Sequence, residues 1–231
     1  MTRGSHEPPR WRAALFDLDG TLIDTRPGMR AALAAAFVEV TGTDPGCDRA
    51  DLSLPLDEMI LSARPDAPAP LRPLLSAAFR RHYDSGCWKV AHLYQGAEEC
   101  LRDLRAGGVR TFVVTNKRTS AAGRLLEHFC IARYLNGVVG QLETGRPRPK
   151  SELARRCMEI AGLDPATTVV VGDSNHDATM AASWNMEFIA ITSGAGPLGP
   201  AQADARRVEV RHLSDAAALM LLRPQGDSRE S

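Results

Sequence analysis

The sequence lacks the features that would tie the chain to a nucleic acid, a membrane or a disulfide framework. Acidic and basic residues balance at 28 each among 231 residues, so there is no basic field of the kind that binding to a phosphate backbone requires. No apolar run is long enough to span a bilayer, and the first ten residues contain no stretch of signal-peptide type. We therefore expect no nucleic-acid partner, no membrane partner and a cytoplasmic location.

Cysteine and lysine are both scarce. The five cysteines are odd in number and never lie in CxxC spacing, which disfavours a disulfide framework or a zinc site. Only three of the 28 basic residues are lysines, at positions 89, 117 and 150. A lysine kept against such a preference for arginine is a candidate for a task that suits a compact point charge.

Hydrophobic residues are abundant enough, at 44%, to build the core of one domain with an insertion. Short apolar runs predict four buried strands, at residues 13–16, 109–114, 168–171 and 188–191. Amphipathic segments of helical period lie among them, near residues 98–106, 120–130, 151–161 and 177–183. Alternating strands and helices predict an α/β fold, a doubly wound, Rossmann-like parallel sheet covered on both faces.

The pattern changes at residues 25–92. Helical segments at 29–40 and 71–83 are joined there by proline-rich connections, and we expect this region to form an inserted α-helical cap. The catalytic core is then expected to comprise residues 11–24 and 93–223. The polar ends, residues 1–10 and 224–231, are expected to be disordered.

Carboxylates follow the first predicted strand. The run Asp17-Leu18-Asp19-Gly20-Thr21 comes directly after residues 13–16, and residues two apart in an extended segment project to the same side. Asp17 and Asp19 can therefore face one ligand at the carboxyl end of the strands, where doubly wound sheets bind their ligands. The alternative is a simple strand-ending turn, for which Asp and Gly are common residues.

A second acidic pair, Asp173 and Asp177, follows the strand predicted at 168–171. Ser174 to Asp177 has the form of a capping box, which is a structural explanation for Asp177 but not for Asp173. Two acidic clusters at one sheet edge repel each other unless a cation lies between them. With oxygen ligands and no His or Cys cluster beside them, the cation that fits is Mg²⁺ rather than zinc.

Two further segments could contact a phosphate group. Thr115 and Asn116 end the strand predicted at 109–114, next to the amides that begin a helix. Lys150 opens another predicted helix, where its ammonium could lie at the rim of the same crevice. A lysine at a helix start is also common on a solvated surface.

Taken together and in this order, the segments resemble the haloacid dehalogenase superfamily, in its phosphoglycolate-phosphatase-like branch with a helical cap. The resemblance covers about residues 13 to 196. Its first, second and fourth motifs match Asp17-Leu18-Asp19-Gly20-Thr21, Val113 to Lys117, and Val171 to Asp177. For the third motif, the lysine form selects Lys150 and the form with Pro-x-Pro selects Arg146; we choose Lys150. In the cap, Ser53-Leu54-Pro55-Leu56 resembles a Gly-Leu-Pro-Leu segment, with Ser53 replacing the glycine.

This resemblance implies an enzyme, a magnesium-dependent phosphatase acting on a small phosphorylated metabolite. Asp17 would be the nucleophile and Asp19 the acid/base. Magnesium would be bound by Asp17, the main-chain carbonyl of Asp19, Asp173 and Asp177. The phosphoryl group would be held by Thr115, Asn116 and Lys150, with Lys150 also counted as catalytic, whereas Lys117 is taken as a surface residue or one of secondary importance.

Two other functions stay open. A phosphomutase of this fold would use the same aspartyl-phosphate and return the phosphoryl group to a sugar. A catalytically silent protein would use the fold only to bind a phosphorylated ligand, although it would have no need of Asp19. We expect a monomer or a weak homodimer.

Overall fold

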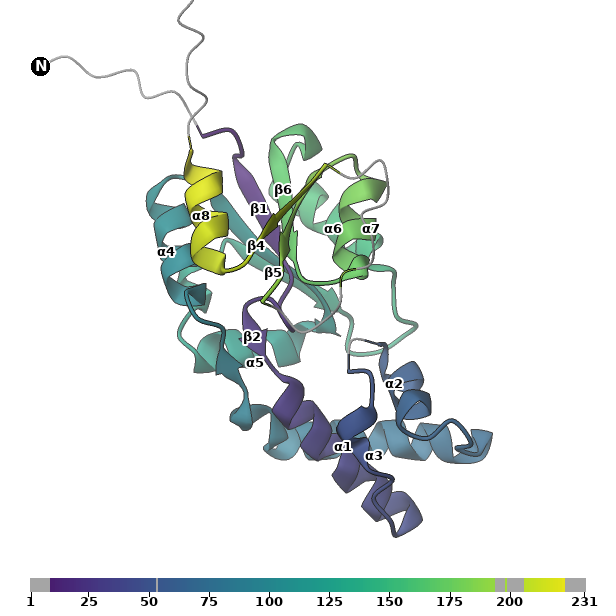
Figure 1. Ribbon diagram of the computed structural model, residues 1–231. Helices are drawn as coiled ribbons and strands as arrows, with labels where there is room; N and C mark the ends of the chain where they lie inside the picture. The colour runs from purple at the N-terminus through teal and green to yellow at the C-terminus, as the bar shows by residue number, and fades with distance from the viewer. Residues whose placement is uncertain (1–8, 53, 194–197, 199–205, 223–231) are drawn as a thin grey trace, which may run out of the picture. The chain divides into compact units, whose positions relative to one another are not determined.

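The structure, a computed structural model, describes residues 9–52, 54–193, 198 and 206–222 (Figure 1). It divides into two compact units, one formed by Met1–Thr21 with Gln95–Ser231 and the other by Leu22–Tyr94. We call them the core unit and the inserted unit. The predicted insertion, 25–92, begins three residues later and ends two residues earlier than the inserted unit. The disorder predicted for 1–10 and 224–231 lies outside the described residues, except at residues 9 and 10.

The core unit contains a six-stranded sheet with the strand order β5-β4-β1-β6-β7-β8. Its strands are β1 (Ala13–Phe16), β4 (Arg110–Arg118), β5 (Gly137–Gln141), β6 (Thr168–Gly172), β7 (Glu187–Ile191) and β8 (Arg207–Val210). All neighbouring strands pair in parallel. Strands β1 and β6 are buried throughout, as expected where helices cover both faces. The predicted doubly wound α/β fold is confirmed.

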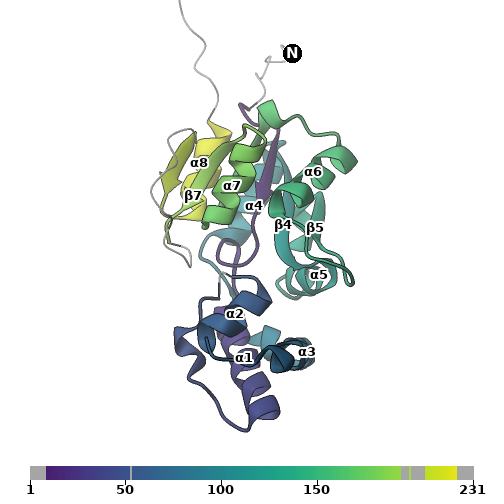
Figure 2. The same cartoon turned by 90° about the vertical axis from the view of Figure 1, so that its right-hand side faces the viewer.

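Five helices accompany the sheet within the described part of the core unit: α4 (Ala97–Ala106), α5 (Thr119–His128), α6 (Lys150–Ala161), α7 (Asn175–Ser183) and α8 (Leu213–Leu221). Helices α4 and α8 pack together on one face, and α6 and α7 pack together on the other (Figures 1 and 2). Beneath α6 and α7, Leu15, Val170 and Phe188 join Leu153 and Met180 in one buried cluster. This packing fixes the strand ends from which the carboxylates project.

The inserted unit is helical, with α1 (Arg26–Thr41), α2 (Leu56–Ala63) and α3 (Arg72–Ser85). Phe37, Ile60 and Leu75, one from each helix, share a separate buried cluster. The two-residue strands β2 (Ile23–Asp24) and β3 (His92–Leu93) pair in antiparallel fashion where the chain enters and leaves the unit. None of the described helices has the length and apolar character needed to cross a membrane.

Several elements differ from the prediction. Strand β4 does not end at residue 114 but continues to Arg118, with an irregular register against β5 between Val114 and Arg118. Strands β2, β3, β5 and β8 and helices α2 and α8 were not predicted from the sequence. These elements are short, and β8 is a partly exposed edge strand without the apolar run by which the other strands were recognised.

Candidate active site

Asp17 lies at the carboxyl end of β1, between the ends of β4 and β6. Its backbone N–H donates to the carbonyl of Val171 at 2.9 Å, so the strand pairing continues through this residue. The chain then turns at Gly20, which has φ of +89°. A Cβ at Gly20 would lie 2.9 Å from Cγ of Asp173, so only glycine lets this turn approach the second acidic cluster. Thr21 completes the link, because its buried hydroxyl donates to Oδ1 of Asp173 at 2.9 Å.

Asp173 and Asp177 lie at the end of β6 and in the first turn of α7. Asp177 is fully buried, and its Oδ2 accepts from the N–H of Ser174 at 3.1 Å and from the Ser174 hydroxyl at 2.6 Å. This is the predicted capping contact. Its Oδ1 instead accepts from Nζ of Lys150 at 2.6 Å. Asp177 therefore caps the helix and also faces the acidic cluster.

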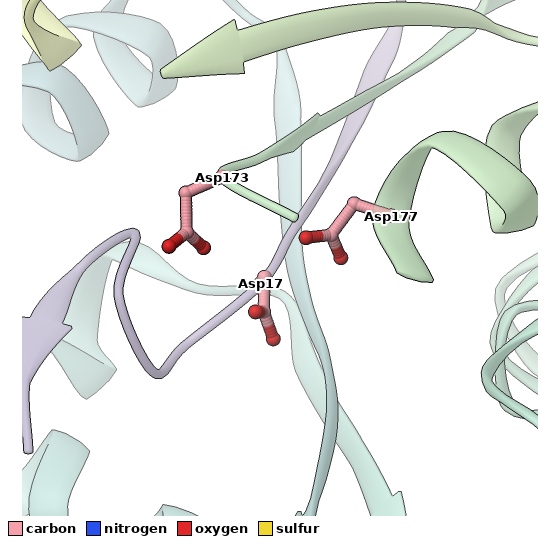
Figure 3. Close-up of side chains that lie close together, drawn as sticks. All are labelled: Asp17, Asp173 and Asp177. Carbon is pink, nitrogen blue, oxygen red and sulfur yellow. The ribbon is translucent and has the colours of Figure 1, made fainter. Parts of the chain in front are cut away.

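The carboxylates of Asp17, Asp173 and Asp177 lie close together (Figure 3). One oxygen from each lies within 4.8 Å of the others, and all three residues are buried. Lys150, the first residue of α6, brings its ammonium to 2.6 Å from Oδ1 of Asp17 and 2.6 Å from Oδ1 of Asp177. Its side chain is only 5% exposed, so the predicted surface alternative for Lys150 is wrong.

The charges in this cluster shift one another's protonation. Burial raises the pKa of Asp17 well above its ordinary value; Lys150 opposes this effect, whereas Asp177, Asp173 and Asp19 add to it. Burial alone would lower the pKa of Lys150, but Asp17 and Asp177 outweigh it and raise that pKa. Lys150 is therefore charged, and a single buried ammonium faces more than one carboxylate.

This imbalance makes the cluster suited to a cation. Three buried carboxylates offer only oxygen donors, the type that Mg²⁺ and Ca²⁺ prefer. A divalent cation would offset the negative charge that Lys150 leaves uncompensated and would favour the ionised form of Asp17. The donor set thus fits a hard divalent cation, with Asp17, Asp173 and Asp177 as the side chains placed to hold it.

The remaining predicted site residues have different surroundings. Thr115 is buried in β4, and its hydroxyl oxygen accepts from the N–H of Lys117 at 3.1 Å. Asn116 is exposed. Arg146, the alternative to Lys150, is exposed in the loop at 142–149, so Lys150 is the one of the two that contacts Asp17. Ser53 lies outside the described residues.

The surface alternative for Lys117 is wrong, whereas a secondary role of this lysine in the site stays open. Its Nζ lies 3.2 Å from Oδ1 of Asp19, and its side chain is 11% exposed, against 29% for Asp19. The scarcity of lysine, which singled out Lys150, applied equally to Lys117 and could have identified it. Two of the three lysines in the chain thus contact the acidic residues of the first motif.

Comparison with known proteins agrees with this arrangement. Residues 14–191 match the model of the haloacid dehalogenase-like hydrolases. A phosphoglycolate phosphatase of Cereibacter sphaeroides is 31% identical over 188 residues, covering 78% of this chain and 84% of the relative. A haloacid dehalogenase-like family hydrolase of Streptococcus pneumoniae shares the fold, with a TM-score of 0.77, 22% identity, and coverage of 90% and 98% of the two chains.

A second solved structure, of the Mycobacterium tuberculosis protein tyrosine kinase A, has a TM-score of 0.71 and 25% identity, and the match covers 91% of this chain and 99% of that one. The family match spans more than half of the chain and includes Asp17, Lys150 and Asp173. The chain therefore belongs to the haloacid dehalogenase-like hydrolase family, in its phosphoglycolate-phosphatase-like branch.

Proposed function

We propose that the chain is a magnesium-dependent phosphatase that hydrolyses a small phosphate monoester through an aspartyl-phosphate on Asp17. The observation that carries this proposal is the buried contact of Lys150 with Asp17 beside Asp173 and Asp177. A binding protein gains nothing from burying a carboxylate whose pKa is raised by its surroundings, whereas a nucleophile held between an ammonium and a cation is kept ionised.

In the proposed first step, an Asp17 carboxylate oxygen attacks phosphorus and the bond from phosphorus to the ester oxygen breaks. Asp19 gives its proton to the departing alkoxide, so the leaving group is released as an alcohol. Asp19, now ionised, accepts a proton from water in the second step. That water attacks phosphorus of the phospho-aspartate, inorganic phosphate is released, and the Asp17 carboxylate is restored.

The surrounding residues hold the phosphoryl group. Lys150 places a fixed positive charge beside Asp17, where negative charge redistributes in both steps. We assign phosphate contacts to Thr115 and Asn116, which lie at the end of the neighbouring strand β4. Magnesium, held by Asp17, Asp173, Asp177 and the Asp19 carbonyl, would supply further neutralisation of phosphoryl charge.

The proposed setting is that of a small-molecule enzyme. The substrate is taken to be a small phosphorylated metabolite, and because a relative is named a phosphoglycolate phosphatase, 2-phosphoglycolate is the first compound to test. We also propose a cytoplasmic location, which suits five cysteines that are all free thiols. A monomer or weak homodimer without nucleic-acid or membrane partners completes the proposal.

The test is phosphate release from a panel of phosphomonoesters, with magnesium or with chelator. Asp17→Asn is compared with Asp103→Asn, which changes an exposed aspartate of α4. Release that needs magnesium, persists in Asp103→Asn and is lost in Asp17→Asn supports the proposal. Isomerisation of a sugar phosphate without phosphate release would indicate a mutase. Binding of a phosphate ester without turnover would indicate a catalytically silent protein, and phosphoryl transfer from ATP to tyrosine peptides would indicate a kinase. Each of these results would refute the proposal.

A further inference from the structure

The ion pair between Lys117 and Asp19 has no part in the mechanism above. Nζ of Lys117 lies 3.2 Å from Oδ1 of Asp19, and the lysine side chain is almost buried. We propose that Lys117 is a positioning residue, which holds the carboxyl group of Asp19 where it can reach both the leaving oxygen and the hydrolytic water. This inference rests on the proposed function, because it acts through the acid/base role of Asp19.

The backbone of Lys117 lies where β4 pairs irregularly with β5. After Val114, the register of β4 with β5 becomes irregular. The N–H of Lys117 donates a hydrogen bond to the hydroxyl of Thr115 at 3.1 Å. The N–H of Gly140 in β5 donates to the Thr119 hydroxyl at 3.1 Å, which fixes the far end of this segment. Such an irregularity redirects side chains locally, and here the side chain of Lys117 reaches Asp19.

Gly140 is the residue that allows this close approach. A Cβ at position 140 would collide with the carbonyl oxygen of Lys117 and lie 3.0 Å from the backbone nitrogen of Thr119. Because both obstacles are backbone atoms, a side chain at this position would push the Lys117 segment away from β5. Gly140 thus sets the position of Lys117, which in turn contacts Asp19.

The pairing answers a geometric need of Asp19. Its side chain is 29% exposed and is followed by the turn at Gly20, so it has fewer packing contacts than buried Asp17. An acid/base group must lie within hydrogen-bond reach of the proton that it transfers, and a misplacement of about 1 Å can cost about 10²-fold in rate. An ammonium fixed at Oδ1 restricts the rotation of the carboxyl group.

The test compares esters whose leaving groups differ in their need for a proton. An alkyl phosphate leaves as a strongly basic alkoxide, whereas p-nitrophenolate departs without protonation. For Lys117→Met, we expect kcat/KM on a phosphate ester of an uncharged alcohol to fall about 10- to 100-fold. On p-nitrophenyl phosphate, we expect kcat/KM to fall less than about 3-fold. The slower second step should also produce a burst of p-nitrophenolate, and Lys117→Arg should restore part of the alkyl activity.

A second variant makes the same test without removing the ammonium. Gly140→Ala should reproduce the selective loss on the alkyl ester, whereas Gly123→Ala, whose Cβ would meet open space on α5, should retain wild-type activity. Thermal unfolding of each variant shows that it is folded. Inhibition by inorganic phosphate should be unchanged, since Lys117 is not assigned to the phosphoryl group.

Other outcomes would overturn the positioning role. An equal loss on both esters would assign Lys117 to the phosphoryl group or to stability, and a rise of KM confined to esters with anionic leaving groups would make it a substrate ligand. Wild-type protein without any phosphate release would overturn the proposed function and this inference together. Release that is lost in Asp17→Asn but unaffected by Lys117→Met would overturn this inference alone.

Discussion

Replacing Lys150 by methionine should make the core unit depend on a divalent cation for its stability. The substitution keeps much of the volume of the side chain but removes the ammonium that lies 2.6 Å from both Asp17 and Asp177. Asp17, Asp173 and Asp177 would then remain buried together without the ammonium of Lys150. The pKa of Lys150 is raised in the folded protein, so the stability it contributes is fully present below its unfolded pKa of about 10.4, and therefore at neutral pH.

The expected loss is large because one partner of a buried pair is removed. Such changes destabilise proteins by about 3–5 kcal/mol. For a chain of this size, that loss lowers the melting temperature by roughly 6–20 °C. Magnesium at about 100 times its Kd stabilises a folded protein by about 2.7 kcal/mol. The variant has lost the ammonium that competes with the cation for Asp17 and Asp177, so it should bind magnesium more tightly than wild type, and the difference between the two should be smaller with magnesium than with chelator.

At low pH, protonation of Asp17 should reduce the loss of stability caused by Lys150→Met. Lys150 opposes the rise in the pKa of Asp17, so this pKa should rise further in Lys150→Met. A carboxyl group whose pKa is raised by folding binds more protons in the folded state, so the unfolding free energy of the variant should increase as pH falls. The difference from wild type should therefore narrow as pH falls from neutral.

The assay is thermal and urea unfolding of wild type, Lys150→Met and Lys89→Met, each with chelator and with magnesium. Lys89 is exposed and serves as the matched control, with an expected change within about 0.5 kcal/mol. A loss below about 1 kcal/mol in chelator, or a loss that magnesium and pH leave unchanged, would refute the view that Lys150 compensates buried carboxylates.

Two further predictions concern the turn after β1 and the start of the inserted unit. Gly20→Ala must displace Asp173 and also adopt a φ of +89°, so we expect magnesium affinity, measured by calorimetry, to fall at least about 10-fold; unchanged affinity would contradict the role of this turn. Burial would raise the pKa of Asp24, but the hydrogen bonds that Asp24 accepts from Arg26 outweigh burial and lower this pKa. Ionised Asp24 therefore stabilises the fold above its unfolded pKa of about 3.9, and this stabilisation is lost as pH falls through the lower folded pKa. The difference in unfolding free energy between wild type and Asp24→Asn should therefore shrink in urea titrations below about pH 4, and a difference independent of pH would count against it.

The sequence was sufficient to predict the strands that carry the site, for a physical reason. Strands buried on both faces must be apolar, and a functional sheet edge must be polar, so the change at Asp17 and again at Asp173 is visible in the residue order. Strand β5 lacks this signal because its five residues include two glycines and a glutamine. Helix α2, flanked by Pro55 and only eight residues long, is stabilised mainly by its packing in the inserted unit.

The part of the site that could not be predicted depends on pairing between strands. From sequence alone, β4 was expected to end where its apolar run ends, at Val114, so Lys117 was not expected to belong to the strand. Its actual course is set by β5, because Gly140 leaves room for the Lys117 carbonyl and the strand continues to Arg118. The course of β4 thus depends on Gly140, which is distant from β4 in the sequence and can be recognised as its neighbour only when the two strands are known to pair. Composition could still have pointed to Lys117, since a chain that almost always uses arginine keeps lysine at two positions in contact with its acidic motif.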